Sequence, residues 1–299
     1  MDFLDPAGVI ASILIGLFAG LVGGLAGIGG SIIMLPALAL WFGYQTPDHD
    51  EHHLYMASAM CVNAVVAYFS ARKHKQHGAL HAPTVRVVLP AMCVAIVAGV
   101  LVSNRLDGTI PKLALVAFIL AYCVYSAIPD KKAPTPTRKP SAQAEGDSDD
   151  DLQPRPLRLS LVATITGFAA GFLGIGGGIL LVPLLQVVGR LPLRRAIAAS
   201  AAVMWITAII GATLKLTTLS SLGLDWLDAL ALASLMAIGA VLGARSGATL
   251  THTLKLPHLK IAIAIILAIA AVRMAASTWS EMRDGHSPEA QTTPASPES

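Results

Sequence analysis

Apolar residues form long uninterrupted runs along this chain, and the charged residues lie between them. The first run, residues 8–44, has 37 residues without a charge, and the run 159–189 has 31. As straight helices they would measure about 55 and 46 Å at 1.5 Å per residue, whereas the hydrocarbon core of a bilayer is about 30 Å thick. Each run must therefore break or fold back. Each has a cluster of glycines near its middle, where a helix breaks most easily.

The remaining apolar runs have ordinary lengths for membrane helices. They cover residues 54–70, 84–103, 110–128, 196–218, 224–247 and 258–279. They lack the strict alternation that a membrane strand shows. The pattern predicts an all-α, multi-pass protein of the cell membrane, surrounded by lipid, with about eight helices when each broken run is counted once.

Composition supports the same class. Charged residues make up 13% of the chain and hydrophobic residues 55%, whereas soluble domains carry about 25% charged residues. The net charge of +3 is too small for a nucleic-acid partner. Three cysteines inside apolar runs indicate free buried thiols rather than a disulfide framework.

Two polar segments divide the chain. Residues 129–157 are rich in proline and in charges of both signs, so we expect a disordered linker. We expect residues 280–299 to form a disordered tail. Residues 1–128 and 158–279 would then be two membrane units.

The two units are copies of one another. Residues 24–36 read GLAGIGGSIIMLP and residues 171–183 read GFLGIGGGILLVP, with seven of the thirteen positions identical at an offset of 147. Further on, residues 57–59 and 199–201 both read Ala-Ser-Ala, at an offset of 142. Each unit is thus one broken run followed by three helices.

Basic residues predict that the copies are inverted. If each broken run crosses the membrane once, the 21 basic residues split 13 to 8 between the two sides. If each is a hairpin that returns to its own side, the split is 16 to 5. Cytoplasmic loops carry the Lys/Arg excess, so the hairpin arrangement is favoured, with a cytoplasmic linker and both termini outside.

The glycine clusters are the candidate binding site. A helix that restarts inside a membrane exposes amide N–H groups at its positive dipole end, and an anion can accept from them without any basic side chain. Inverted repeats with interrupted helices are the architecture of many secondary transporters. Alternatively, the glycines only let helices pack closely, which is our reading of Gly20, Gly23 and Gly24. The candidate substrate-binding residues are Gly27, Gly29, Gly30, Ser31, Ser58, Gly174, Gly176, Gly177, Gly178 and Ser200.

Three polar residues near the clusters leave alternatives open. Ser58 and Ser200 could face the same centre or bond back to their own helix carbonyls. Asn63 could be a ligand group, although an interhelical hydrogen bond is the more usual role.

The loop 45–53 carries three histidines, which suit a metal, but a hydrated loop is the simpler interpretation. We predict no metal and no cofactor.

The paired GxGGxxxxxP elements, Gly27–Pro36 and Gly174–Pro183, resemble those of the sulfite exporter TauE/SafE family of membrane permeases. The Ala-Ser-Ala helix start and residues 239–245 are also similar to that family. The resemblance covers about residues 10–128 and 158–278. It implies a plasma-membrane transporter, with members linked to export of sulfite or organosulfonates.

We therefore expect a secondary transporter of a small anion that works by alternating access. The resemblance implies that the anion is sulfite or an organosulfonate. A passive anion channel and a permease for an unrelated small anionic metabolite are the alternatives. An enzyme is disfavoured because the apolar runs contain no buried acid–base pair and no Cys-x-x-Cys. Homo-oligomer formation is left open.

Overall fold

The computed structural model describes residues 4–26, 29–45, 48–76, 78, 80–127 and 156–250, together with positions 268, 272–273 and 275–276. Within these ranges the secondary structure is helical. The first half contains α1 (Pro6–Ala26), α2 (Ser31–Phe42), α3 (Glu51–Gln76), α4 (Ala82–Ser103) and α5 (Thr109–Ala127). The second half contains α6 (Pro156–Leu173), α7 (Gly178–Val187), α8 (Leu193–Leu219), the short 3₁₀ helix η2 (Ser220–Leu222) and α9 (Trp226–Leu250).

The predicted all-α membrane class is confirmed. Six of the described helices, α1, α3, α4, α6, α8 and α9, are long and apolar enough to cross a membrane, and α2, α5 and α7 are shorter apolar helices. Large apolar side chains on their outer faces are exposed, as a lipid-facing surface requires; examples are Ile10, Leu14, Leu161, Ile165 and Ile238. The expected helix at 258–279, the linker up to residue 155 and the tail 280–299 lie essentially outside the described residues.

Both long apolar runs are interrupted where the glycines cluster. α1 ends at Ala26 and α2 begins at Ser31, and α6 ends at Leu173 and α7 begins at Gly178. The second helix of each pair is short, with 12 residues in α2 and 10 in α7. At 1.5 Å per residue they extend only about 18 and 15 Å, roughly half of the hydrocarbon thickness.

Loops from both halves meet at one end of the bundle. We call this the histidine end and define it by residues 43–45, 48–50, 104–108 and 220–225. The Thr109 N–H donates to the Asp48 carbonyl (3.1 Å), and Asn104 Nδ2 donates to Thr218 Oγ1 at the end of α8 (2.8 Å). The opposite end, defined by residues 78, 80–81 and 188–192, is the arginine end.

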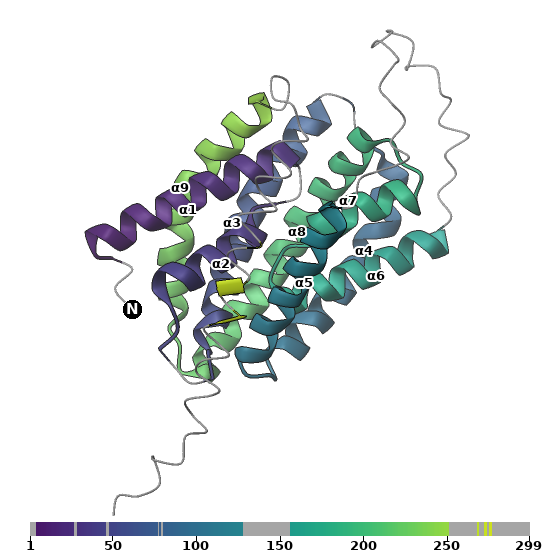
Figure 1. The fold of residues 1–299 in the computed structure, drawn as a ribbon. Coiled ribbons are helices and arrows are strands. Elements are labelled where there is room, and N and C mark those ends of the chain that lie inside the picture. The colour runs from purple at the N-terminus through teal and green to yellow at the C-terminus, as the bar shows by residue number, and fades with distance from the viewer. Residues whose placement is uncertain are drawn as a thin grey trace, which may run out of the picture.

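The two broken runs start at opposite ends of the bundle. Along α1, Gly16, Gly20 and Gly24 lie against Met236, Ala240 and Ala244 of α9, so α1 and α9 run in the same direction, away from the histidine end. Along α6, Gly167 and Gly171 lie against Met92 and Ile96 of α4, so α6 runs away from the arginine end. Figure 1 shows these two pairs on opposite sides of the central helices α3 and α8.

At these glycines the paired parallel helices lie so close together that no side chain would fit between their backbones. A Cβ atom added at Gly20 would overlap the Ala240 carbonyl oxygen, and one at Gly171 would overlap the Ile96 carbonyl oxygen. The interpretation of Gly20 and Gly24 as packing glycines is confirmed, because small residues let membrane helices approach backbone to backbone.

We predict that Gly20→Leu strongly lowers the amount of folded protein, because α1 and α9 would have to separate. Gly223→Asn is the matched control: Gly223 has nothing within 4 Å of its added Cβ, and its φ of 72° is one that asparagine tolerates. Size-exclusion chromatography of detergent extracts measures the monodisperse fraction. Equal yields of the two variants would contradict this packing.

Candidate functional site

The tips of the two broken runs meet at one side chain of α3. Asn63 Oδ1 accepts a hydrogen bond from the Gly30 N–H (3.0 Å), and Asn63 Nδ2 donates to Ser31 Oγ. The same Nδ2 lies 3.5 Å from the Ile175 carbonyl oxygen in the second tip. Asn63 is fully buried. We call this arrangement, Asn63 with residues 29–31 and 174–178, the tip junction.

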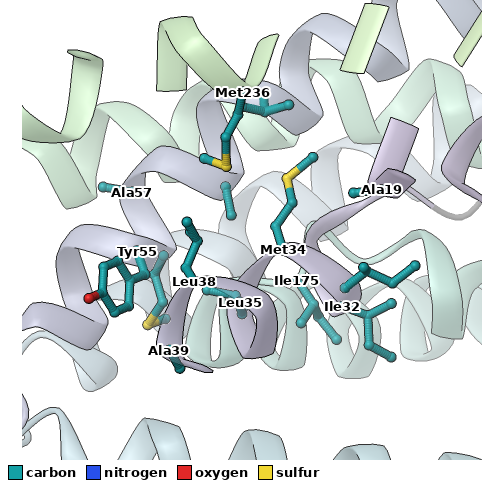
Figure 2. Packing of buried hydrophobic residues seen from close by; sticks show 14 of the residues in the cluster. Ala19, Ile32, Met34, Leu35, Leu38, Ala39, Tyr55, Ala57, Ile175 and Met236 are labelled. Carbon is teal, nitrogen blue, oxygen red and sulfur yellow. The ribbon is translucent and has the colours of Figure 1, made fainter. Parts of the chain in front are cut away.

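The structure assigns Asn63 the interhelical role that was the more usual alternative, and extends it, because one amide contacts both tips. Ile175 packs in the same apolar cluster as Met34 and Ile32 of α2, which Figure 2 shows at close range. The sequence marks Asn63 only as a polar residue in an apolar run; its contact with Ile175 of the second tip, 112 residues further along the chain, required the fold.

Backbone conformation accounts for part of the glycine content of the tips. Gly29, Gly174, Gly176 and Gly177 have φ between 71° and 79°, a region that other residues rarely adopt. Gly177 in this conformation is the N-cap of α7. The density of glycines therefore does not itself indicate a ligand, because the turn between two helices already requires it.

The start of α7 carries amide groups that have no acceptor among the described residues. The first backbone hydrogen bond of α7 runs from the Leu181 N–H to the Gly177 carbonyl (3.0 Å). No bond is recorded in the described ranges for the N–H groups of Gly178, Ile179 and Leu180, which precede it. These are the positive end of the α7 dipole, and Gly177 provides no side-chain cap.

Both tips are buried in this conformation. All of residues 29–31 and 174–178 are buried. A Cβ added at Gly29 would lie 3.2 Å from the Met204 sulfur of α8, and one at Gly174 would lie 2.7 Å from Met56 Cγ of α3. Flexible thioether side chains therefore cover the junction; they are Met34, Met56, Met92 and Met204.

The predicted serines lie in three different environments. Ser31 Oγ donates to the Ala59 carbonyl of α3 (3.2 Å), within the junction. Ser58 Oγ lies 2.9 Å from the carbonyl oxygens of Leu54 in its own helix and of Ala229 in α9, so its hydroxyl is engaged in helix contacts. Ser200 Oγ is buried and has no hydrogen-bond partner among the described residues. Gly27 lies outside the described residues.

Ser200 shares a helix face with a residue that contacts the first tip. It lies one turn before Met204 on α8, and residues four apart share a helix face. The Met204 sulfur is near Gly29, so that face of α8 is turned toward the first tip.

The expectation of a hydrated loop at residues 45–53 is wrong for its second half. α3 already begins at Glu51, and His49, His52 and His53 are 4%, 0% and 1% exposed. Helix contacts from α5 and α8 bury them. The described residues contain no group of three or more His, Cys, Asp or Glu that could hold a metal ion.

Comparison with known proteins identifies the family. The model of the sulfite exporter TauE/SafE family matches residues 12–274. The chain belongs to this family. It is 27% identical, over 86% of its length and 91% of the relative's, to a probable membrane transporter protein of Methanocaldococcus jannaschii.

Two further relatives extend the comparison. The protein MamO of Magnetospirillum gryphiswaldense, named a probable membrane transporter protein, is 27% identical over 87% of this chain, which spans only 44% of MamO. A probable membrane transporter protein of Haemophilus influenzae is 25% identical over 64% of this chain and 68% of its own length. No solved structure matches. This member of the TauE/SafE family is therefore a membrane transporter.

We predict that Asn63→Ala lowers the thermal stability of this transporter by several degrees. The Gly30 N–H would lose its acceptor in a buried site, which costs about 1–3 kcal/mol, and each kcal/mol shifts the Tm of a protein of this size by roughly 2–4 °C. Thr213→Ala is the control, since the exposed Thr213 hydroxyl only bonds the Ile209 carbonyl of its own helix (2.9 Å). Differential scanning fluorimetry in detergent makes the comparison. A Tm shift for Asn63→Ala no larger than that for Thr213→Ala would show that the tips do not depend on this side chain.

Proposed function

We propose that this transporter carries a small anion of the sulfite or organosulfonate class outward across the membrane, by alternating access around the tip junction. The observation that carries the proposal is the start of α7, where the N–H groups of the buried Gly178 and Ile179 and of the half-buried Leu180 have no acceptor among the described residues. Buried donors without partners are costly. An anion that accepts from them would remove that cost and gain from the helix dipole.

Charge selectivity follows from the groups present. The proposed site combines the backbone N–H groups at the start of α7 with the Ser200 hydroxyl, and the residues of the tip junction include no carboxylate. Such a site favours an anion over a cation. The sulfur chemistry of the substrate rests on membership of the TauE/SafE family and not on the geometry of the site.

We propose that the two halves are inverted repeats. Helix α1, the first of the first half, packs against α9, and α6, the first of the second half, packs against α4. With the two parts of each broken run counted separately, the first helix of each half thus lies against the fourth helix of the other half. The two hairpins then approach the junction from opposite ends of the bundle. Rocking of one half against the other would expose the junction first to one side and then to the other.

The covered tips are consistent with an occluded state. Methionine has three rotatable bonds and adapts to changing surroundings at low cost. Rotation of Met56 or Met204 away from the tips would open the junction without moving a charged residue. We propose that these side chains form the thin gates of the transport cycle.

A carrier and a passive channel differ in a property that can be measured. In proteoliposomes a carrier shows saturable sulfite flux and counterflow, whereas a channel shows neither counterflow nor saturation at low concentration. A panel of sulfite, taurine, sulfoacetate and an unrelated carboxylate separates the sulfur anions from an unrelated anionic metabolite. Absence of saturable flux for every sulfur anion would refute the proposed substrate class.

We predict that Ser200→Ala raises KM for sulfite about tenfold or more, because a hydrogen bond to a charged ligand contributes about 1.5–3 kcal/mol. The Tm of the variant should not fall, since the hydroxyl has no partner to lose among the described residues. Ser58→Ala is the matched control: it loses contacts to Leu54 and Ala229, so its Tm should fall while KM stays the same. If Ser200→Ala lowers the Tm and leaves KM unchanged while Ser58→Ala raises KM, Ser200 is not part of the binding site.

We predict that a reporter placed before α1 is extracytoplasmic and one placed after α5 is cytoplasmic. The arginine end holds nine basic residues of the described ranges and the histidine end holds three, and cytoplasmic ends carry the excess. The nine are Arg72, Lys73, Lys75, Arg86, Arg158, Arg190, Arg194, Arg195 and Arg245, and the three are Arg105, Lys112 and Lys215. Paired alkaline phosphatase and fluorescent-protein fusions measure the two positions. Both reporters on one side would contradict the hairpin arrangement.

A further inference from the structure

The histidine end contains a fully buried lysine in contact with neutral partners. Lys215, near the end of α8, is 0% exposed. Its amine lies 2.5 Å from His53 Nδ1 of α3 and donates to Ser103 Oγ at the end of α4 (3.1 Å). Among the described residues no aspartate or glutamate contacts this amine. A buried ammonium without a counter-ion is unfavourable, and ionisable groups inside a membrane protein usually mark a functional site.

Hydrogen-bond directions fix the state of His53. Its Nε2 lies 3.0 Å from the Leu106 carbonyl oxygen, which can only accept, so Nε2 carries the proton. Nδ1 of the neutral ring is then the acceptor for the Lys215 amine. His53 therefore orients the amine and supplies no negative charge.

Two donors near the amine, and one further polar ring nitrogen, remain unused among the described residues. An ammonium has three N–H donors, and two are directed at His53 and Ser103. The Ser103 hydroxyl accepts from Lys215, and no acceptor is recorded for its own proton. His52 is 0% exposed; its Nδ1 lies 3.1 Å from the Tyr44 hydroxyl, and its Nε2 has no partner. An acceptor-rich ligand would satisfy these donors.

A second lysine adds to the positive potential. Lys112 of α5 is also 0% exposed and lies over the Tyr44 ring, 3.9 Å from its centroid. His52 interacts electrostatically with both Lys112 and Lys215. Carboxyl groups lie at the same end: Asp48, Asp50 and Asp107 are in the loops, and Glu51 is buried in the first turn of α3. Burial raises the pKa of Asp50, and repulsion from Asp48, Asp107 and Glu51 adds to the shift, against a hydrogen bond from the Gly108 N–H.

We propose that Lys215, Ser103 and His52 form a second anion site, which binds a small oxyanion of the sulfite or sulfate type. His53 is ten residues from Asn63 along α3, so the site lies about 15 Å from the tip junction, near the edge of the hydrocarbon core if the junction is at its centre. It is thus placed at one mouth of the pathway. The site does not depend on transport through the junction, so it can be tested by itself.

The other half of the chain lacks this site. At the offset of 142 that relates Ser58 to Ser200, Lys215 corresponds to Lys73, which is exposed. Further along the sequence the offset is 140, and Ser103 corresponds to Gly243. Binding of the oxyanion is therefore expected at the histidine end and not at the arginine end. Lys73→Met provides a matched control for Lys215→Met.

The test is the Tm of the purified full-length protein in detergent, in sodium gluconate, with sodium sulfite or sodium sulfate added at constant ionic strength. We expect a rise of about 5 °C for the wild type and for Lys73→Met when the oxyanion is at about 100 times its dissociation constant. Lys215→Met should show a smaller rise than the wild type, because only the tip junction then binds the oxyanion. Its Tm without oxyanion should equal or exceed that of the wild type, because an apolar side chain replaces an uncompensated charge.

Two further variants keep the result interpretable. Ser103→Ala should retain the fold and raise the apparent dissociation constant about tenfold. Ser200→Ala should keep the part of the rise that depends on Lys215. If Ser200→Ala abolishes the rise and Lys215→Met retains it in full, the second site is refuted while the proposed function stands. A low Tm for Lys215→Met together with a normal oxyanion response would show that the lysine is only structural.

A lipid headgroup is the other source of an oxyanion near the membrane edge. Phosphatidylglycerol micelles added in place of sulfite should give no rise that depends on Lys215, because the amine is fully buried. A Lys215-dependent rise with the lipid and none with sulfite or sulfate would overturn the proposal of a small-oxyanion site.

Discussion

A helix that stops inside a membrane leaves its first amide N–H groups without carbonyl partners, and the bilayer offers no water to replace them. Both broken runs of this chain meet that constraint at one place. On the first tip, Asn63 accepts from the Gly30 N–H and donates to Ser31 Oγ. On the second, the N–H groups at the start of α7 have no acceptor among the described residues. A side chain thus takes up the N-cap amide of the first tip, and no side chain of the described residues does so at the second; the N–H groups of Ser31 and Ile32 at the start of α2 have no acceptor among the described residues either.

The rest of the bundle serves to bring the two tips together. Glycines on α1 and α6 allow backbone contact with α9 and α4, so that the first helix of each half lies against a helix of the other half. α3 and α8 fill the space between these pairs and carry the side chains that face the tips, Asn63 and Met204. Along the same two helices, His53 and Lys215 meet at the histidine end. Two polar centres are therefore held by one helix pair.

Much of the architecture could be predicted because membrane thickness limits helix length. Runs of 37 and 31 uncharged residues cannot cross as single straight helices, and the interruptions fall at the predicted glycines. The contacts of the site could not be predicted in this way. Asn63 differs from other polar residues only by its neighbours in space, and Lys215 looks like an ordinary charge near a helix end until α3 and α4 bury it. The positive φ of Gly176 and Gly177 is likewise a property of the turn.

The central claim is that backbone amides at the tip junction bind the transported anion. Cryo-electron microscopy of the full-length protein, prepared with and without sodium sulfite, tests it most directly. The account predicts additional density within hydrogen-bond distance of the Gly178 and Ile179 N–H groups and close to Ser200 Oγ, present only with sulfite. Tips that remain closed on each other at Asn63 in every state, with sulfite density elsewhere or none at all, would contradict it.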